Sequence, residues 1–373
     1  MKKIKLVKKD DFDFQFFIAF LCLLLIGFVM LFSSSMESAR ANYGDSLYFI
    51  KRQVIWAILG GIAMFFMARI KLSFVKRSSN VLMIISIILL IAVLLIGTNL
   101  NGGKRWIVIA GFSFQPSELM KIAIVIFFAS LLSIPENVKK IKFFWRKGGL
   151  FVYLLLVGFI GALLLLEPHL SVTIIIILLS ASMLIAGGAQ IKHFFWMLVP
   201  AVAGVAGLIA WEPYRMKRFT TFINPFADKL GEGWQIIQSL YAIGSGGLFG
   251  LGPFQSRQKF LYIPEPQNDF IFSIVCEELG WIWASAIILL FAFLIWRGIK
   301  IALSAPTRFQ SLTAFGIMAL IAWEVILNIA VITSSVPNTG IPLPFFSSGG
   351  TTLFINMAAM GLVLNISRKA DVT

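Results

Sequence analysis

Residues 257–280 read RQKFLYIPEPQNDFIFSIVCEELG, and within this stretch a polar segment gives way to a run of apolar side chains. About sixty residues that are not apolar enough to span a membrane precede the run, which continues to residue 296. One carboxylate, that of Asp269, lies just before the apolar run. The stretch therefore predicts a chain that crosses a lipid bilayer and a long polar loop that ends at the membrane surface.

The composition also indicates a membrane protein. Of 373 residues, 59% are hydrophobic and 13% are charged, which is typical of a polytopic membrane protein. Cys22 and Cys276 lie in apolar segments and only two histidines are present, so neither a disulfide framework nor a zinc site is indicated. The net charge of +15 suits contact with anionic lipid and anionic substrates. It does not indicate nucleic acid, because the Lys and Arg lie in short loops beside apolar runs.

Ten apolar runs of spanning length predict ten transmembrane helices, because lipid offers no partner to the open backbone of other structures. We expect an all-α polytopic membrane protein, a single domain over residues 1–373, with a long outer loop at about 211–270 between the seventh and eighth helices. The predicted runs are 15–33, 53–70, 81–97, 119–134, 149–166, 170–188, 194–210, 271–296, 310–333 and 351–367.

The distribution of positive charge predicts the orientation of these helices. With the amino terminus inside, the inner segments hold 20 Lys and Arg, whereas the short outer segments hold 6. Positive residues favour the cytoplasmic side. Both termini are therefore expected in the cytoplasm, and the 211–270 loop is expected on the outer face.

The first polar outer segment, 101–121, contains Arg105, and Glu118 and Lys121 follow near the start of the next helix. One interpretation is a re-entrant connector with a capped helix and a lysine that extends to the interface. The other is an anion-binding cradle of Arg105 and Lys121, in which Glu118 pairs with one of the two cations.

The second outer segment, 211–270, contains Arg215 and Arg218, and later Lys259 and Asp269. The cations could simply attract lipid phosphates, and Asp269 could simply cap the eighth helix. A role in chemistry is favoured by the combination of a carboxylate with this many cations in one outer loop.

Three glutamates lie inside predicted spans. Charge is costly there, so each should face the bundle and find a partner, and an internal polar network is at least as good an interpretation as catalysis. These residues are Glu277, Glu278 and Glu324.

The third outer segment, 337–350, is dense in proline and glycine. It predicts a rigid irregular loop that either lines a substrate groove, with Ser347 and Gly349 in it, or only connects two helices.

Several long motifs occur along the chain: RWI at 105–107, QPSE at 115–118, SLYAIGSGGLFGLG at 239–252, SRQKFLYIPEPQNDFIF at 256–272, CEELG at 276–280 and NTGIPLPFFSSGG at 338–350. In sequence and in order they resemble the SEDS family, the shape, elongation, division and sporulation proteins, and more closely the FtsW and SpoVE branch than RodA. The resemblance covers essentially the whole chain.

The resemblance implies a peptidoglycan glycosyltransferase of the bacterial plasma membrane. It would polymerise lipid II, a disaccharide-peptide on undecaprenyl pyrophosphate, and would work with a class B penicillin-binding protein. The motif NDFIF at 268–272 makes Asp269 the catalytic candidate. His169 departs from the family pattern, because many members have Asp there. Asn268 and Ser348 depart as well, since Thr and Tyr are the usual residues.

The expected chemistry agrees with this resemblance. Pyrophosphate is a good leaving group, so one carboxylate that acts as base on the acceptor hydroxyl suffices, whereas glycosidases need two. Attack at the anomeric carbon would invert it. The candidates for binding the pyrophosphate or the rest of the substrate are Arg105, Glu118, Lys121, Arg215, Arg218, Lys259, Ser347 and Gly349. A divalent cation, Mg²⁺ or Mn²⁺, could share the neutralisation of charge, although the sequence shows no dedicated carboxylate cage for it.

Two other classes of function remain open. A flippase or transporter of the same lipid would suit ten helices with intramembrane glutamates, but we see no inverted repeat and the polar residues gather at the outer face. A non-catalytic scaffold that recruits a penicillin-binding protein would leave Asp269 as a helix cap.

Overall fold

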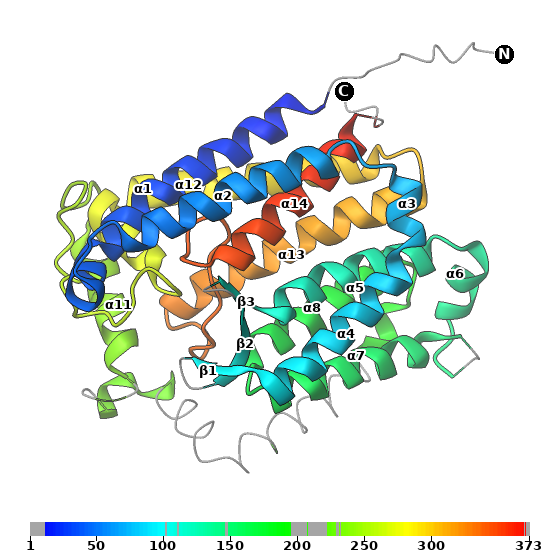
Figure 1. Ribbon diagram of the computed structural model, residues 1–373, viewed down its shortest axis with the longest axis horizontal. Coiled ribbons are helices and arrows are strands. Elements are labelled where there is room, and N and C mark those ends of the chain that lie inside the picture. The colour runs from blue at the N-terminus through cyan, green and yellow to red at the C-terminus, as the bar shows by residue number, and fades with distance from the viewer. Residues whose placement is uncertain are drawn as a thin grey trace.

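The structure is a computed structural model, and it describes residues 12–100, 103–109, 112–145, 148–194, 207, 222–228, 231, 233–368 and 370. Its long helices run roughly parallel to one another, with α3 and α6 at one end of the bundle and α11 near the other (Figure 1). The elements are α1 Phe14–Tyr43, α2 Tyr48–Met67, α3 Leu72–Arg77, α4 Ser79–Ile96, β1 Thr98–Leu100, β2 Gly103–Ile109, β3 Phe112–Phe114, α5 Pro116–Leu132, α6 Pro135–Ile141, α7 Leu150–Leu166, α8 Leu170–Ala186, the 3-10 helix η1 Pro225–Asp228, α11 Trp234–Ser245, α12 Ile271–Leu303, α13 Arg308–Ile332 and α14 Gly350–Ser367.

The helices fall on the predicted apolar runs. Six of the helices that the structure describes are long and apolar enough to cross a membrane, or seven if α5 and α6, which meet at 101°, form one broken span. The apolar helices α7 and α8 are shorter. Nine of the ten predicted runs coincide with described helices, and the seventh, 194–210, lies almost wholly outside the described residues. The count of ten spans therefore stays a prediction.

One small sheet interrupts the helical chain. Strands β1, β2 and β3 form an antiparallel sheet in the order of the sequence, where a connector was expected. The chain is otherwise mostly helical, as predicted. The sheet gives Arg105, on β2, a defined position above the helix ends.

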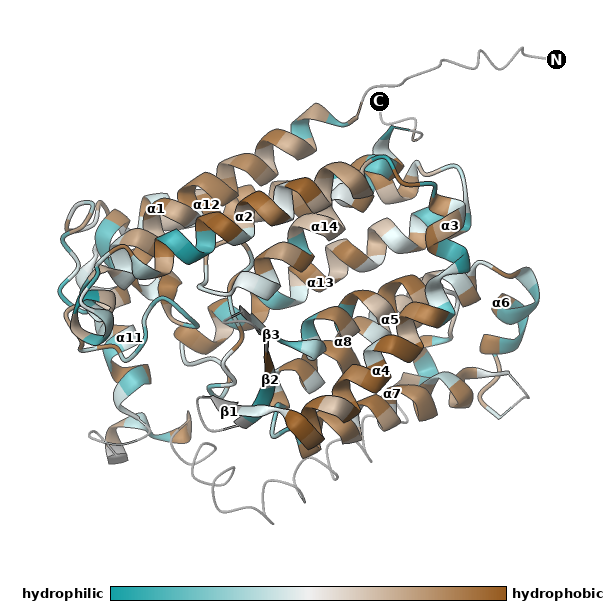
Figure 2. Cartoon of the chain, viewed as in Figure 1, coloured by the Kyte–Doolittle hydropathy of each residue, from teal (hydrophilic) through white to brown (hydrophobic). Residues whose placement is uncertain are grey.

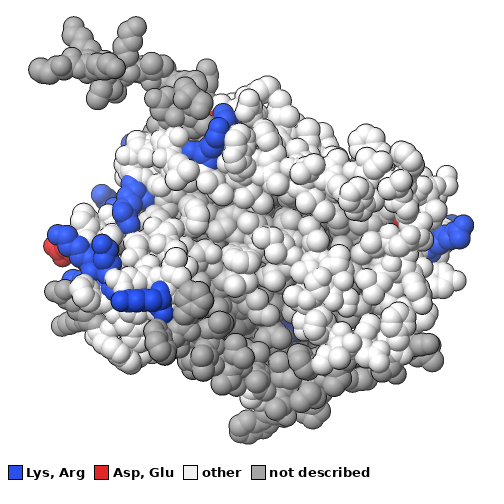
Figure 3. All heavy atoms as spheres, turned by 180° about the vertical axis from the view of Figure 1, so that it is seen from behind, with Lys and Arg blue, Asp and Glu red and all other residues white. Residues whose placement is uncertain are grey.

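The outside of the bundle is apolar. Along α2 only Gln53 and Gly60 are buried, and the brown colour of Figure 2 runs over the outward surfaces of the helices. In Figure 3 the Lys and Arg side chains lie at the two ends of the molecule, and the face between them carries almost no charge. This distribution fits a bundle surrounded by lipid, with its polar residues either at the ends or inside.

A break in α12 explains the glycine-rich segment before it. The helix is non-helical at Gly280, where φ is 75°. The carbonyls of Glu277 and Glu278 at the break accept hydrogen bonds from Leu251 N (2.9 Å) and Gly252 N (3.0 Å). A Cβ on Gly280 would lie 2.3 Å from the backbone nitrogen of Gly250, so glycine is needed for this close approach.

We expect Gly280→Ala to lower the free energy of unfolding by about 2 kcal/mol or more, because a positive φ and a backbone clash act together. Thermal unfolding of the purified protein measures the effect. Gly158→Ala in α7 is the matched control, since a Cβ there meets no atom within 4 Å. Equal melting temperatures for the two variants would contradict this account of the break.

Candidate functional site

Asp269 lies two residues before α12, at the amino-terminal end of that helix. Helix α12 begins at Ile271, and its N-cap position is Phe270. The N-cap position therefore lies one residue after Asp269, and the interpretation of Asp269 as a helix cap stays a prediction. The side chain is half-buried, which leaves it accessible while the surrounding segments restrict it.

Asn328 of α13 fixes the backbone on which Asp269 sits. Its Nδ2 donates to the carbonyl oxygen of Asp269 (2.8 Å) and to that of Ile341 (2.7 Å). The side chain is almost fully buried, at 1% exposed. Asn328 therefore joins the segment before α12 to the loop before α14. Sequence reasoning did not single it out, although a polar residue inside an apolar run is a signal for such a role.

The loop before α14 closes over the carboxylate. Gly340 has φ of 69°, and a Cβ there would lie 2.9 Å from Oδ2 of Asp269 and 4.0 Å from Oγ of Ser171. The backbone nitrogen of Ser348 donates to the carbonyl oxygen of Gln267 (2.8 Å). Segments from α8, α12 and the 334–349 loop thus meet at Asp269.

Arg105 holds the small sheet against the turn between α7 and α8. Its Nε donates to the carbonyl oxygen of Glu167 (3.3 Å) and its Nη2 to that of Pro168 (2.6 Å). His169 follows in the same turn, with Ser117 Oγ 3.3 Å from its Nδ1. Burial, together with the nearby charges of Arg105 and Lys121, lowers the pKa of His169 to about 3, so a neutral imidazole occupies this position.

Lys121 lies inside the bundle between two carboxylates. Its Nζ is 2.9 Å from Glu118 and also forms an ion pair with Glu324 of α13. The predicted pairing of Glu118 with one of the cations and the predicted partner for Glu324 are both found. Lys121 is only 1% exposed, so its burial does not favour the predicted contact with pyrophosphate. The predicted contacts of Lys121 and Arg105 with pyrophosphate both stay predictions.

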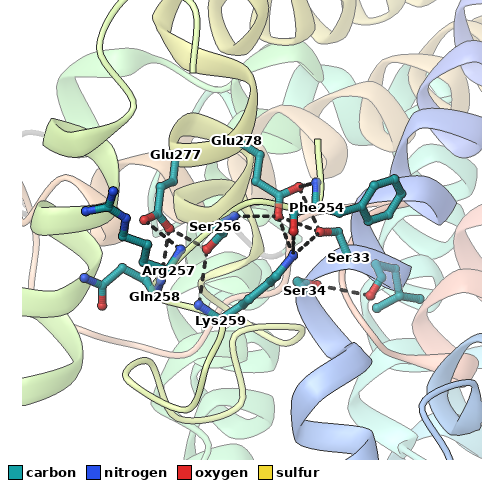
Figure 4. A network of polar contacts seen from close by, with 10 residues as sticks. Ser33, Ser34, Phe254, Ser256, Arg257, Gln258, Lys259, Glu277 and Glu278 are labelled. Atoms are coloured by element: carbon teal, nitrogen blue, oxygen red, sulfur yellow. Dashed lines mark hydrogen bonds and ion pairs between the residues drawn. The ribbon is translucent and has the colours of Figure 1, made fainter. Parts of the chain in front are cut away.

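A second buried network joins α1, α12 and the outer loop (Figure 4). Nζ of Lys259 donates to Glu278 Oε1 (3.0 Å), to Ser33 Oγ (3.3 Å) and to the carbonyl oxygen of Phe254 (2.5 Å). Glu277 accepts from Ser256 Oγ and from the backbone nitrogen of Arg257. Both glutamates therefore have partners inside the protein, as predicted.

This network changes how Lys259 is interpreted. Its side chain is 0% exposed and its three ammonium donors are all used. The placement favours a role in holding the loop and not the predicted contact with substrate, which stays a prediction.

Ser347 and Gly349 shape the loop before α14 through Gln53 of α2. Gln53 Nε2 donates to the carbonyl oxygen of Ser347 (3.3 Å), and Gly349 N donates to Gln53 Oε1 (3.4 Å). Ser347 Oγ accepts from Leu343 N (2.8 Å). The predicted contacts of these residues with substrate stay predictions. Arg215 and Arg218 lie outside the described residues.

Glu167 is a buried acid beside this site. It is 0% exposed, and neither carboxylate oxygen has a hydrogen-bond partner among the described residues. Burial raises its pKa to about 8, although the charge of Arg105 acts in the opposite direction. The folded protein therefore keeps a proton on Glu167 at neutral pH.

We expect the melting temperature to fall as pH rises from about 6.5 to about 8. In this window folded Glu167 holds a proton that unfolded Glu167 has lost, so stability decreases with pH. His169 acts in the opposite sense only below its unfolded pKa of about 6.5. Glu167→Gln should remove this slope in a pH series of melting curves. Parallel curves for the two proteins would contradict a protonated Glu167.

Comparisons with known proteins identify the family of the chain. Residues 14–372 match the FtsW, RodA and SpoVE family, described as cell cycle protein. The chain is 45% identical to stage V sporulation protein E of Bacillus subtilis, in an alignment that covers 97% of this chain and 98% of the relative. It is 37% identical to the probable peptidoglycan glycosyltransferase FtsW of Trichlorobacter lovleyi, over 96% of this chain and 93% of the relative.

Two solved structures share the fold. A chain from a study of polymerization and crosslinking by a peptidoglycan synthase complex superposes with a TM-score of 0.79 at 26% identity, covering 96% of this chain and 98% of that one. The rod shape determining protein RodA of Thermus thermophilus superposes with a TM-score of 0.70 at 24% identity and the same coverage. The chain therefore belongs to the FtsW, RodA and SpoVE family.

Proposed function

We propose that this protein is a peptidoglycan glycosyltransferase that polymerises lipid II at the outer face of the bacterial plasma membrane, with Asp269 as the general base. The observation that carries the proposal is the placement of Asp269. Its carboxylate lies at the end of the bundle opposite the termini, beside Gly340, on a backbone fixed by Asn328. The relatives named as peptidoglycan glycosyltransferases support the same activity.

The reaction needs one base and a good leaving group. Asp269 would take the proton from the 4-hydroxyl of the acceptor sugar. The oxygen then bonds to the anomeric carbon of the donor as the bond to undecaprenyl pyrophosphate breaks, so the anomeric configuration inverts. General-base catalysis supplies typically 10²–10⁴-fold, and the remaining acceleration must come from positioning and charge stabilisation.

Two further elements of the proposal concern what the protein binds. The likeness to a chain of a peptidoglycan synthase complex supports a class B penicillin-binding protein as the partner. In the part of the chain that the structure describes, no three His, Cys, Asp or Glu side chains form a metal-binding cluster. An Mg²⁺ or Mn²⁺ ion would be held by one or two carboxylates together with the phosphates of the substrate.

The scaffold interpretation gives Asp269 no role in chemistry, so the Asp269→Asn variant distinguishes it from the proposed function. No contact among the described residues specifically favours a flippase.

We expect Asp269→Asn to lower polymerisation of labelled lipid II by about a hundredfold or more, because the amide cannot accept a proton from the acceptor. The readout is the length distribution of glycan strands made with the cognate penicillin-binding protein. Asp45→Asn is the control, since Asp45 pairs with Lys51 (2.6 Å) on an exposed outer turn. Normal strand synthesis by well-folded Asp269→Asn protein would remove the general-base assignment.

Gly340→Ala should slow polymerisation by about tenfold or more, because its methyl group would displace the carboxylate of Asp269. Gly44→Ala is the control for the effect of backbone strain alone. Gly44 has nearly the same φ as Gly340, 70°, but a Cβ there meets no atom within 4 Å. Both variants should lose similar stability, and only Gly340→Ala should lose activity. Equal activities would show that the contact with Asp269 is unimportant.

The orientation of the chain is tested by cysteine labelling. In a background without Cys22 and Cys276, Gln255→Cys should react with an impermeant maleimide in intact cells, whereas Lys139→Cys should react only after lysis. Both positions are exposed, at opposite ends of the bundle. The reverse order would place Asp269 in the cytoplasm and contradict the proposed function.

A further inference from the structure

A basic pocket lies at the end of the bundle opposite Asp269. It has a volume of about 450 Å³ and is formed by α3 and the residue before it, by Ser133 directly after α5, and by Thr307 with the first turn of α13. Figure 1 places α3 at the end near the termini, which the charge distribution assigns to the cytoplasm. The pocket is therefore separate from the site of the proposed reaction.

All the charged side chains that line the pocket are cations. Lys71, Lys76 and Arg308 line it, and none of its lining residues is acidic. The ammonium groups of Lys71 and Lys76 make no ion pair within the part of the chain that the structure describes, and Lys76 lies 5.9 Å from the ring of Phe309. Three cations around one cavity without a carboxylate favour an anionic ligand.

Arg308 is held in place at the pocket. Its Nε donates to the carbonyl oxygen of Leu132 (2.9 Å) and its Nη2 to that of Gly187 (2.9 Å), so Nη1 remains for a ligand. Arg308 is also the first residue of α13, a helix of 25 residues, so the positive end of a helix dipole lies at the same cavity. A fixed guanidinium and a helix start suit a phosphate group.

The surroundings of the pocket favour a lipid over a soluble phosphate. Phe74, in α3, is 60% exposed, and Leu303, at the end of α12, is 80% exposed. Both are within a few residues of the pocket lining. The acyl chains of a lipid whose phosphate enters the pocket would lie along such side chains, whereas inorganic phosphate would gain no contact with them. Basic pockets between transmembrane helices on the cytoplasmic side suit anionic headgroups.

We propose that this pocket binds the headgroup phosphate of one anionic phospholipid of the cytoplasmic leaflet. Lys71, Lys76 and Arg308 contact the phosphate, and the acyl chains lie along Phe74 and Leu303. The proposal is independent of the glycosyltransferase activity.

Titration of the purified protein with dioctanoyl phosphatidylglycerol, followed by native mass spectrometry, tests the proposal. The wild-type protein should bind one copy saturably. Lys71→Gln/Lys76→Gln should raise Kd about tenfold or more, since each lysine near a phosphate changes binding about fivefold. The control, Lys139→Gln/Lys300→Gln, removes two charges outside the pocket at the same end of the bundle and should change Kd less than about twofold.

Two further probes identify the ligand. Dioctanoyl phosphatidylcholine, which has a phosphate but no net charge, should bind at least about tenfold more weakly, and equimolar inorganic phosphate should not displace phosphatidylglycerol. Equal Kd for the two double variants would overturn the proposal. Displacement by equimolar phosphate would overturn the assignment to a lipid. Melting curves of both double variants in neutral detergent verify that each protein is folded, so a weakened Kd cannot be ascribed to misfolding.

Discussion

A charged side chain buried in a membrane protein must find its partner within the protein, and the end of the bundle that holds Asp269 depends on that constraint. Lys121 of α5 is bound by Glu118 and by Glu324 of α13, while Lys259 of the outer loop is bound by Glu278 of α12. Removing one partner of such a pair typically costs 3–5 kcal/mol, because the other charge stays buried. The pairs therefore fix how these helices and the loop are joined.

The same helices position the carboxylate of Asp269, the proposed general base. Glu324 and Asn328 lie four residues apart on α13, so one helix face pairs with Lys121 and also holds the backbone of Asp269. The loop before α14 is held at one side by Asn328 and at the other by Gln53 of α2. Rigid helices thus fix the position of the backbone that carries the carboxylate of Asp269. A general base that must reach one hydroxyl group of the acceptor requires such a fixed position.

Sequence reasoning predicted the features that depend on composition and local spacing. Nine of the ten predicted apolar runs are found as helices, and the partners of the intramembrane glutamates follow from the cost of charge in lipid. The spacing of the residues predicted that Glu118 pairs with Arg105 or Lys121, and the structure shows the pair with Lys121. Sequence reasoning could not predict that Lys259 is buried, because the pattern of residues around a loop lysine is the same for an exposed and a buried side chain. One of the partners of Lys259 is Ser33, which is 226 residues away in the chain. The role of Asn328 was missed for the same reason, since it depends on a contact with Asp269, which is 59 residues away. The small sheet is local, but its strands are short and were not separated from the connector between two helices.

The most direct test of the account is to follow labelled lipid II with the purified chain in liposomes, together with its class B penicillin-binding protein. Strand length and anomeric configuration are measured in the same experiment. The account predicts glycan strands with inverted, β-configured linkages and one undecaprenyl pyrophosphate released for each bond formed. Transfer of intact lipid II across the bilayer without strands, or strands with retained configuration, would contradict it.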